Sequence, residues 1–361
     1  MISEGEDTRR LKRGQRPPFG ELLEDVDAVL VYSHMNPDPD TVGSALGLRF
    51  LLRERYGKKV GLCYRGIVGR AENRVMLRLL ARDMLPARDI DRSDYDAAIL
   101  VDAQPGYGFD GVEEGLRLLG VVDHHPPAVA AGAVPFMDIR PDYGSTSTII
   151  TEYLQAEELD PPAKIATALF YGLKTDTMDL CRRASPADVE AYEWLFPRVD
   201  RKLLSQIENP SLSRDYFDTF AAAVTRAVTY RRTVITEVGR VAYPDMVAEI
   251  ADRMIKLEGT QWSICFGLHD QRIYFSVRTN HPTRDAGEVV KKVLREEGVG
   301  GGHDTMAAGR VQLLEESEET YQRVVRTLWE RFLEVLGEDS SEGRRLVRTV
   351  TAEHSAEPPA S

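Results

Sequence analysis

Cysteine is scarce in this chain of 361 residues, which contains three of them. Cys63, Cys181 and Cys265 lie far apart, without the close pairs of a zinc knuckle or the density of a disulfide-stapled domain. The sequence therefore predicts a fold without covalent cross-links, in a reducing cytoplasmic environment.

Long apolar runs are absent as well. No stretch approaches the roughly 18 consecutive apolar residues that a membrane-spanning helix needs. The segment from Ser3 to Arg16 is charged and lacks the apolar core of a signal peptide. Neither secretion nor a membrane anchor is expected.

Basic residues are in deficit, because 46 Lys and Arg stand against 58 Asp and Glu, for a formal net charge of −12. A long polyanion such as duplex DNA normally binds to clustered Lys and Arg that release its counterions. The charge balance therefore favours a short or small phosphorylated ligand, and bound divalent cations would offset part of the negative charge. An acidic surface that keeps the protein soluble explains the same number equally well.

The sequence does contain Asp and His residues that directly follow apolar segments. The apolar run at residues 118–122 leads directly into Asp123, His124 and His125. A carboxylate and two imidazoles are costly to bury at the end of a strand unless a cation or a substrate charge compensates them. A metal ion or a charged substrate is therefore expected here.

A second such segment is the predicted strand at residues 28–33. It is followed by His34, Asp38 and Asp40 in a loop stiffened by two prolines, so that three side chains able to bind a metal can converge on one side.

Two further carboxylates complete the pattern. Asp102 ends the apolar run at 97–101, and Asp176 follows the helical run at 165–173. Either residue alone is explained by helix capping or turn formation. Together the residues are more informative than singly, because the carboxyl ends of parallel strands lie at one edge of the sheet. Ligands of α/β proteins bind at that edge.

These side chains form a ligand set rich in oxygen, with a minority of imidazole and no cysteine. Such a set favours Mn²⁺, with Mg²⁺ as the alternative, over a structural Zn²⁺ site. Six ligands exceed the needs of one ion, so we expect two ions about 3.5–4 Å apart, bridged by Asp102. The predicted metal ligands are His34, Asp38, Asp40, Asp102, His124 and Asp176.

The order of these motifs resembles the DHH phosphoesterase superfamily, which includes RecJ exonucleases, nanoRNases, cyclic dinucleotide phosphodiesterases, pyrophosphatases and exopolyphosphatases. The resemblance rests on His34-x-x-Pro37-Asp38-x-Asp40, Asp102, Asp123-His124-His125 and Asp176, and on the glycine-rich residues 300–309, which look like the signature of the associated C-terminal domain. It extends over roughly residues 28–314. One departure is Pro39, where many members of the superfamily have glycine.

The resemblance assigns roles to these residues. It implies one Mn²⁺ held by His34, Asp38 and Asp102, and a second held by Asp40, Asp102, His124 and Asp176. His125, Asp102 and Asp123 are the expected catalytic residues, with His125 facing the scissile phosphate and Asp123 orienting His124. The expected substrate contacts are Arg278, Gly301, Gly302 and His303, since a guanidinium beside a glycine-rich turn suits a phosphate. Gln104 is expected close behind the site, while Asp138 and Asp142 are interpreted as turn or capping residues.

Residues 144–148 are open to two interpretations. They either seat a phosphate at a helix N-terminus or form an ordinary capped helix start, and the second is the simpler reading.

The predicted architecture is α/β in two domains. A catalytic DHH domain with a mainly parallel sheet is expected at residues 21–197, and a smaller α/β domain with a mixed sheet at 215–337. The active site is expected in the cleft between them. Residues 198–214 are predicted to be a linker, residues 1–20 a flexible N-terminus and residues 338–361 a disordered tail.

Three functions remain open. The first is a two-metal phosphoesterase that cleaves short nucleotides: an oligonucleotide of two to four residues, a linear or cyclic dinucleotide, or 3′-phosphoadenosine 5′-phosphate. The second is a manganese-dependent pyrophosphatase or exopolyphosphatase, and the third is a nucleotide-binding regulator without activity. The expected partner is a small nucleotide or a short single strand, not duplex DNA or a membrane, and a homodimer is possible.

Overall fold

The computed structural model describes residue 11 and residues 15–105, 108–109, 116–127, 134–315 and 317–347, without the side chains of residues 108, 109 and 303. Two compact units divide the chain, an N-terminal unit from Met1 to Ser211 and a C-terminal unit from Leu212 to Ser361. Among the described residues, no helix is both long enough and apolar enough to span a bilayer.

The N-terminal unit is built on a six-stranded sheet in which every pair of neighbouring strands is parallel. In spatial order the strands are β3 (Met84–Pro86), β2 (Lys59–Arg65), β1 (Ala28–Met35), β4 (Ala97–Val101), β7 (Arg117–Asp123) and β8 (Phe136–Ile139). The central strands are buried along most of their length, which explains their continuous apolar sequences. A separate two-stranded pair, β5 (Gln104–Pro105) and β6 (Gly108–Phe109), follows β4.

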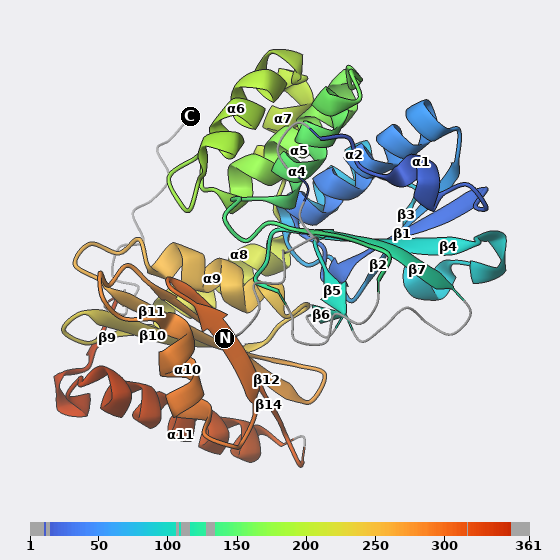
Figure 1. Cartoon of the computed structure of the whole chain (residues 1–361). Coiled ribbons are helices and arrows are strands. Elements are labelled where there is room, and N and C mark those ends of the chain that lie inside the picture. The colour runs from blue at the N-terminus through green and yellow to red at the C-terminus, as the bar shows by residue number, and fades with distance from the viewer. Residues whose placement is uncertain are drawn as a thin grey trace, which may run out of the picture. The chain divides into compact units, whose positions relative to one another are not determined.

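Helices lie over one face of this sheet (Figure 1). They are α1 (Phe19–Leu22), α2 (Pro39–Tyr56), α3 (Ala71–Leu80), α4 (Thr146–Ala156), α5 (Ala163–Asp176), α6 (Pro186–Leu195) and α7 (Arg201–Glu208). The other face packs on a second apolar cluster that includes residues from the short 3-10 segment η1 (Ala87–Asp89).

Helices α2 and α5 approach each other closely through glycine. A Cβ atom on Gly43 would lie 2.5 Å from the carbonyl oxygen of Ala168, and one on Gly172 would lie 2.8 Å from the Cα atom of Asp40. Real Cβ atoms do not come this close to backbone, so the contact requires glycine at both positions. The packing sets the N-terminus of α2, which carries Asp40, against the C-terminal part of α5, which ends in Asp176.

The C-terminal unit contains a seven-stranded mixed sheet. Its spatial order is β13 (Val299–His303), β14 (Met306–Gln312), β12 (Arg272–Thr279), β11 (Trp262–His269), β10 (Thr233–Arg240), β9 (Val228–Thr229) and β15 (Arg344–Arg345). Only the β10–β11 pair is parallel. One face packs against α10 (Ala286–Leu294) and α11 (Glu318–Leu336), the other against α8 (Arg214–Arg226) and α9 (Asp245–Met254).

The predicted fold class is confirmed, since a parallel sheet and a smaller mixed α/β unit are both present. Several element boundaries differ from those predicted from the sequence. Helix α2 begins at Pro39, inside the expected loop, because the Asp38 side chain caps it by accepting a hydrogen bond from the Thr41 amide at 3.0 Å. Pro39 is thereby explained, since the first helical position has no need of an amide donor.

Three segments expected to be irregular carry structure. Phe19, in the expected flexible N-terminus, is fully buried in the core. The expected linker contains helix α7, which buries Leu204 and Ile207 on one face, and the two units divide within this range, after Ser211. The expected C-terminal tail adds strand β15 to the edge of the second sheet. Residues 348–361 of that tail lie outside the described part of the chain.

Candidate metal centre

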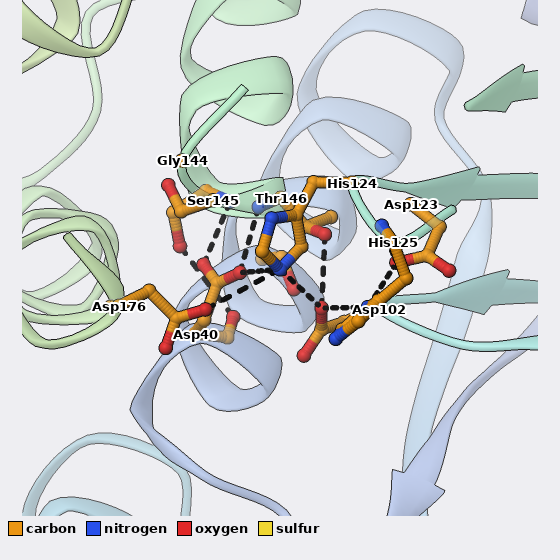
Figure 2. Close-up of polar contacts among 12 residues, drawn as sticks. Asp40, Asp102, Asp123, His124, His125, Gly144, Ser145, Thr146 and Asp176 are labelled. Atoms are coloured by element: carbon orange, nitrogen blue, oxygen red, sulfur yellow. Dashed lines mark hydrogen bonds and ion pairs between the residues drawn. The ribbon is translucent and has the colours of Figure 1, made fainter. Parts of the chain in front are cut away.

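The carboxyl ends of three neighbouring strands bring the predicted ligands together. Strands β1, β4 and β7 are adjacent in the sheet and end beside His34, Asp102 and His124 respectively. Asp40 joins them from the first turn of α2 and Asp176 from the last turn of α5. Figure 2 shows the carboxylates of Asp40, Asp102 and Asp176 grouped around the His124 ring.

Three side chains form what we call the first group: His34, Asp38 and Asp102. One donor atom from each lies within 4.8 Å of the others. The Nε2 atom of His34 is 3.3 Å from Oδ2 of Asp102 and 3.8 Å from Oδ2 of Asp38.

Asp40, His124 and Asp176 form the second group, by the same criterion. The Nε2 atom of His124 is 3.3 Å from Oδ2 of Asp176 and 3.9 Å from Oδ2 of Asp40. Asp102 also reaches this side, because its Oδ1 atom lies 3.7 Å from Nε2 of His124 and 3.7 Å from Nδ1 of His125. The two oxygens of Asp102 therefore face different groups, Oδ2 the first and Oδ1 the second.

The backbone of Asp102 has a positive φ of 55°. This left-handed conformation is uncommon for a residue other than glycine, and such residues concentrate at functional sites. The strand ends here, while the Asp102 amide still donates to the carbonyl of Val122 at 2.9 Å.

The N-terminus of helix α4 holds the carboxylate of Asp40 in place. The amides of Thr146 and Ser147, in the first turn of α4, donate to Asp40 at 2.7 and 2.8 Å. The predicted capped start of α4 is confirmed, with Ser145 accepting from the Thr148 amide. The amides that could have seated a phosphate bind a carboxylate of the protein instead.

The contacts of two threonine hydroxyls with Asp102 were not anticipated from the sequence. The hydroxyl of Thr41 donates to Oδ2 of Asp102 at 2.6 Å, and that of Thr146 donates to Oδ1 at 3.0 Å. A possible signal was their position in the first turn of helices that follow site residues.

One predicted role is wrong: Asp123 orients His125 and not His124. Its Oδ1 accepts from the backbone amide of His125 at 3.2 Å and from Nδ1 of the same ring at 2.9 Å. The reason is that Asp123 and His125 are two residues apart where β7 ends, so their side chains meet in a turn. Gln104 lies behind the site as expected, donating to Oδ2 of Asp123 at 2.7 Å.

Both histidines of the two groups are held in the same way. The Nδ1 atom of His34 donates to the carbonyl of Met35 at 2.7 Å, and that of His124 donates to the carbonyl of Tyr143 at 3.2 Å. This leaves the Nε2 atom of His124 facing carboxylates, while that of His34 faces Asp38 and Asp102 and also lies 2.6 Å from the Thr41 hydroxyl oxygen. Backbone carbonyls impose this kind of orientation on metal-binding histidines.

The electrostatics of the site call for added positive charge. Burial, followed by the charges of Asp102 and Asp176, raises the pKa of Asp40 well above its ordinary value. For His124, burial disfavours the charged ring, but Asp176 and the other carboxylates outweigh it and raise the pKa well above the usual range. Crowded buried carboxylates of this kind are stabilised by a nearby cation.

The donor chemistry fits a divalent cation. The Nε2 atom of His124 is buried and makes no hydrogen bond within the described part of the chain, although three carboxylates surround it. A buried polar atom without a hydrogen bond is costly, and coordination of a metal ion by this atom removes that cost.

The predicted substrate contacts lie in the C-terminal unit. The guanidinium of Arg278 donates to Asp252 at 2.5 Å and to the Ser276 hydroxyl at 2.7 Å. Gly302 has a φ of 155°, and a Cβ atom there would lie 2.3 Å from the carbonyl oxygen of Met306. The area around Gly301 is open, with nothing within 4 Å of the position of its missing Cβ. The side chain of His303 is outside the described residues, and a role of these residues in substrate binding stays a prediction.

Comparison with known proteins supports the resemblance. Residues 28–173 match the model of the DHH family, N-terminal domain, and residues 231–332 match that of the DHHA1 domain. An uncharacterized protein of Methanocaldococcus jannaschii is 32% identical over 315 residues, which cover 86% of this chain and 64% of that protein. The cyclic-di-AMP phosphodiesterase GdpP of Geobacillus thermodenitrificans is 26% identical over 317 residues, which cover 81% of this chain and 46% of that enzyme.

Among solved structures, an exopolyphosphatase-related protein from Bacteroides fragilis matches with a TM-score of 0.69 at 15% identity. The match covers 88% of this chain and 96% of that one, and it shows a shared fold. The chain spans less than two thirds of the length of each of the two sequence relatives above. With both domain models matched in order and the motif residues gathered at one sheet edge, the chain belongs to the DHH superfamily of phosphoesterases, as a DHH domain followed by a DHHA1 domain.

Proposed function

We propose that this protein is a two-metal phosphoesterase that hydrolyses phosphate esters of short nucleotides. The observation that carries the proposal is the carboxylate of Asp102, whose two oxygens face two separate groups of candidate ligands. A shared carboxylate between two such groups is the arrangement that two-metal hydrolases use to hold a pair of ions.

In this proposal the first group, His34, Asp38 and Asp102, holds one ion. The second group, Asp40, His124 and Asp176, holds the other together with Asp102. Carboxylates and imidazoles without thiolates suit Mn²⁺ or Mg²⁺. When bound, two such ions supply Lewis acidity toward the phosphate oxygens and toward a water molecule.

The protein residues have separate tasks. His125, held by Asp123, would hydrogen-bond to the nonbridging oxygens of the phosphate and stabilise the charge that develops on them. Thr41 and Thr146 keep the shared carboxylate of Asp102 in one orientation. In the C-terminal unit, Arg278 and the glycine-rich strand β13 would bind the rest of the substrate.

A short nucleotide is the substrate class that the combined observations favour. The formal charge of −12 argues against a long polyanion. The similarity to a cyclic-di-AMP phosphodiesterase extends over 81% of this chain, so it is not confined to the metal-binding domain. The two ligand groups alone would suit hydrolysis of inorganic pyrophosphate or polyphosphate equally well. Inorganic pyrophosphate or polyphosphate is therefore the alternative substrate.

A substrate panel tests the proposal. With Mn²⁺ added, we expect the protein to hydrolyse at least one of RNA dinucleotides to heptamers, cyclic di-AMP and 3′-phosphoadenosine 5′-phosphate at least tenfold faster than pyrophosphate or polyphosphate. Release of phosphate and nucleotide would be measured by chromatography. Hydrolysis of pyrophosphate alone would contradict the nucleotide assignment. No hydrolysis of any member, with nucleotide binding retained, would favour an inactive regulator.

Asp123→Asn tests the role assigned to His125. Asparagine replaces one of the two accepting oxygens by an NH2 group, which can only donate. We therefore expect the His125 ring to lose its fixed orientation and kcat to fall about 10- to 100-fold. Binding of Mn²⁺, measured by calorimetry, should be unchanged because Asp123 contacts neither group in our assignment. Asp91→Asn is the control, as this exposed carboxylate accepts hydrogen bonds from Ser93 in a surface turn. A loss of metal binding in Asp123→Asn would assign Asp123 to the ligand set.

A further inference from the structure

A buried charged network lies between β8 and α4, outside both ligand groups. Arg140 is 1% exposed, and its guanidinium donates to both oxygens of Asp138 at 2.9 and 2.7 Å. It also bonds to Glu152, which is 7% exposed. Asp138, interpreted from the sequence as a turn or capping residue, is instead a fully buried residue of β8.

Two tyrosines complete this network. Tyr153 donates its hydroxyl proton to Asp138 at 2.5 Å, and Tyr143 donates to Glu152 at 3.0 Å while accepting from Arg140 at 3.2 Å. Removing three charges from water is expensive, and well-packed apolar residues would often stabilise a core as well or better. The cost of this network indicates a role beyond stability, exerted through the residues that it contacts.

The backbone of the same segment reaches the metal centre. The Arg140 amide donates to the carbonyl of Asp123 at 2.9 Å, at the peptide bond that leads into His124. The Tyr143 amide donates to the carbonyl of Arg140 at 3.0 Å, and the carbonyl of Tyr143 accepts from Nδ1 of His124. Arg140 thus fixes the turn whose carbonyl orients the His124 ring.

The next residues of the chain contact two more ligands. Thr146 and Ser147 donate their amides to Asp40, and the Thr146 hydroxyl donates to Asp102. Figure 2 shows Gly144, Ser145 and Thr146 beside Asp40 and His124. A shift of this turn would therefore move Asp40 and His124 of the second group together with the shared Asp102, whereas the same described contacts do not join it to His34 or Asp38 of the first group.

We propose that Arg140 is a positioning residue for the second ion, acting through the Tyr143 carbonyl on His124. The inference rests on the proposed two-metal function and deepens it, because it makes the two ions separable. Outer partners of metal ligands typically change affinity 10- to 100-fold when altered.

The test is Mn²⁺ binding to the full chain, measured by calorimetry. Arg140→Lys keeps the charge but loses the planar fork that binds both oxygens of Asp138. We expect the affinity for the second ion to fall about 10- to 100-fold. The affinity for the first ion should stay within about threefold of the original protein.

Two background variants assign the affected ion. In a His34→Ala background, which removes the first group, adding Arg140→Lys should weaken the single remaining site. In an Asp176→Ala background, which removes the second group, adding Arg140→Lys should change nothing. Equal weakening in both backgrounds, or none in either, overturns the proposal.

Folding is controlled separately. Circular dichroism and thermal melting would show whether Arg140→Lys is folded. If it is not folded, Mn²⁺ binding to Tyr143→Phe tests the proposal in its place. That variant removes the hydroxyl bonded to Arg140 and Glu152 but leaves the carbonyl, and several-fold weaker binding of the second ion alone is expected. Unchanged binding in a folded Tyr143→Phe contradicts the proposal.

Glu157→Gln is the matched control. It alters a buried carboxylate in the same unit that bonds to Arg55 and Tyr56, away from the metal centre. Its Mn²⁺ binding should match that of the original protein. If the original protein binds no Mn²⁺, the proposed function fails; if it binds two ions and Arg140→Lys does too with unchanged affinity, only this inference fails.

Discussion

Replacing Asp102 by alanine will abolish Mn²⁺-dependent hydrolysis, with kcat lower by about three to four orders of magnitude. Among the described residues, Asp102 is the carboxylate shared by the two proposed ligand groups, so its loss would remove a ligand from each ion. A loss of roughly 4 to 5.5 kcal/mol of transition-state stabilisation corresponds to this factor at about 1.36 kcal/mol per tenfold. Turnover with the best substrate of the panel, together with calorimetric Mn²⁺ titration, would measure both consequences.

The same substitution separates an enzyme from a regulator. Asp94→Ala removes an exposed carboxylate of the same unit and should leave turnover within about twofold of the original. Retention of activity within threefold in Asp102→Ala would refute the bridging role. A protein that binds nucleotide but shows no turnover before the substitution would be a binding protein, and the substitution would then affect metal uptake alone.

Gly172→Ala will destabilise the N-terminal unit by about 2–3 kcal/mol, at the upper end of the usual range for overpacking. The added methyl group would lie 2.8 Å from the Cα atom of Asp40 and 2.9 Å from the carbonyl oxygen of Pro39. Because these are backbone atoms, no side chain can rotate away, and helices α2 and α5 must move apart. The free energy of unfolding would be measured by urea titration, with Mn²⁺ titration reporting the expected weaker binding of the second ion.

Gly20→Ala is the control for this prediction. Gly20 lies in α1, and the nearest atom to its added Cβ is on the Tyr56 ring at 3.8 Å, an ordinary contact. Its stability should change by no more than about 1 kcal/mol, in the stabilising direction that alanine has over glycine in a helix. Equal stability of Gly172→Ala and the original protein would show that the two helices tolerate separation.

Much of the fold could be predicted from the sequence because the signals were local. The apolar run at 97–101 forms strand β4 with the bounds that were expected. The start of α2 was missed because two prolines suggested a loop, whereas capping by Asp38 makes Pro39 a suitable first residue.

The meeting of the predicted metal ligands could be inferred from one topological rule. The residues that hold those ligands in place by hydrogen bonds could not. Parallel strands end at a common edge, so His34, Asp102 and His124 could be expected to meet before any coordinates were known. The partner of Asp123 could not be foreseen, since it depends on the turn that follows β7. Likewise, nothing local distinguished Asp138 from an ordinary turn residue, because its partner Tyr153 comes from another element.

By itself, the sequence determined the fold class and the kind of chemistry to expect: carboxylates and imidazoles placed after apolar strands, without thiolates, predict oxygen-rich cation binding in an α/β fold. The tertiary structure alone decided which oxygen of Asp102 faces which group, that the N-terminus of α4 holds Asp40, and that a buried arginine fixes the turn beside His124. The physical reason is the distance along the chain between the residues that interact. Strand and helix patterns are set by neighbours in the chain, whereas the direction of a hydrogen bond between distant segments is set by how the whole core packs.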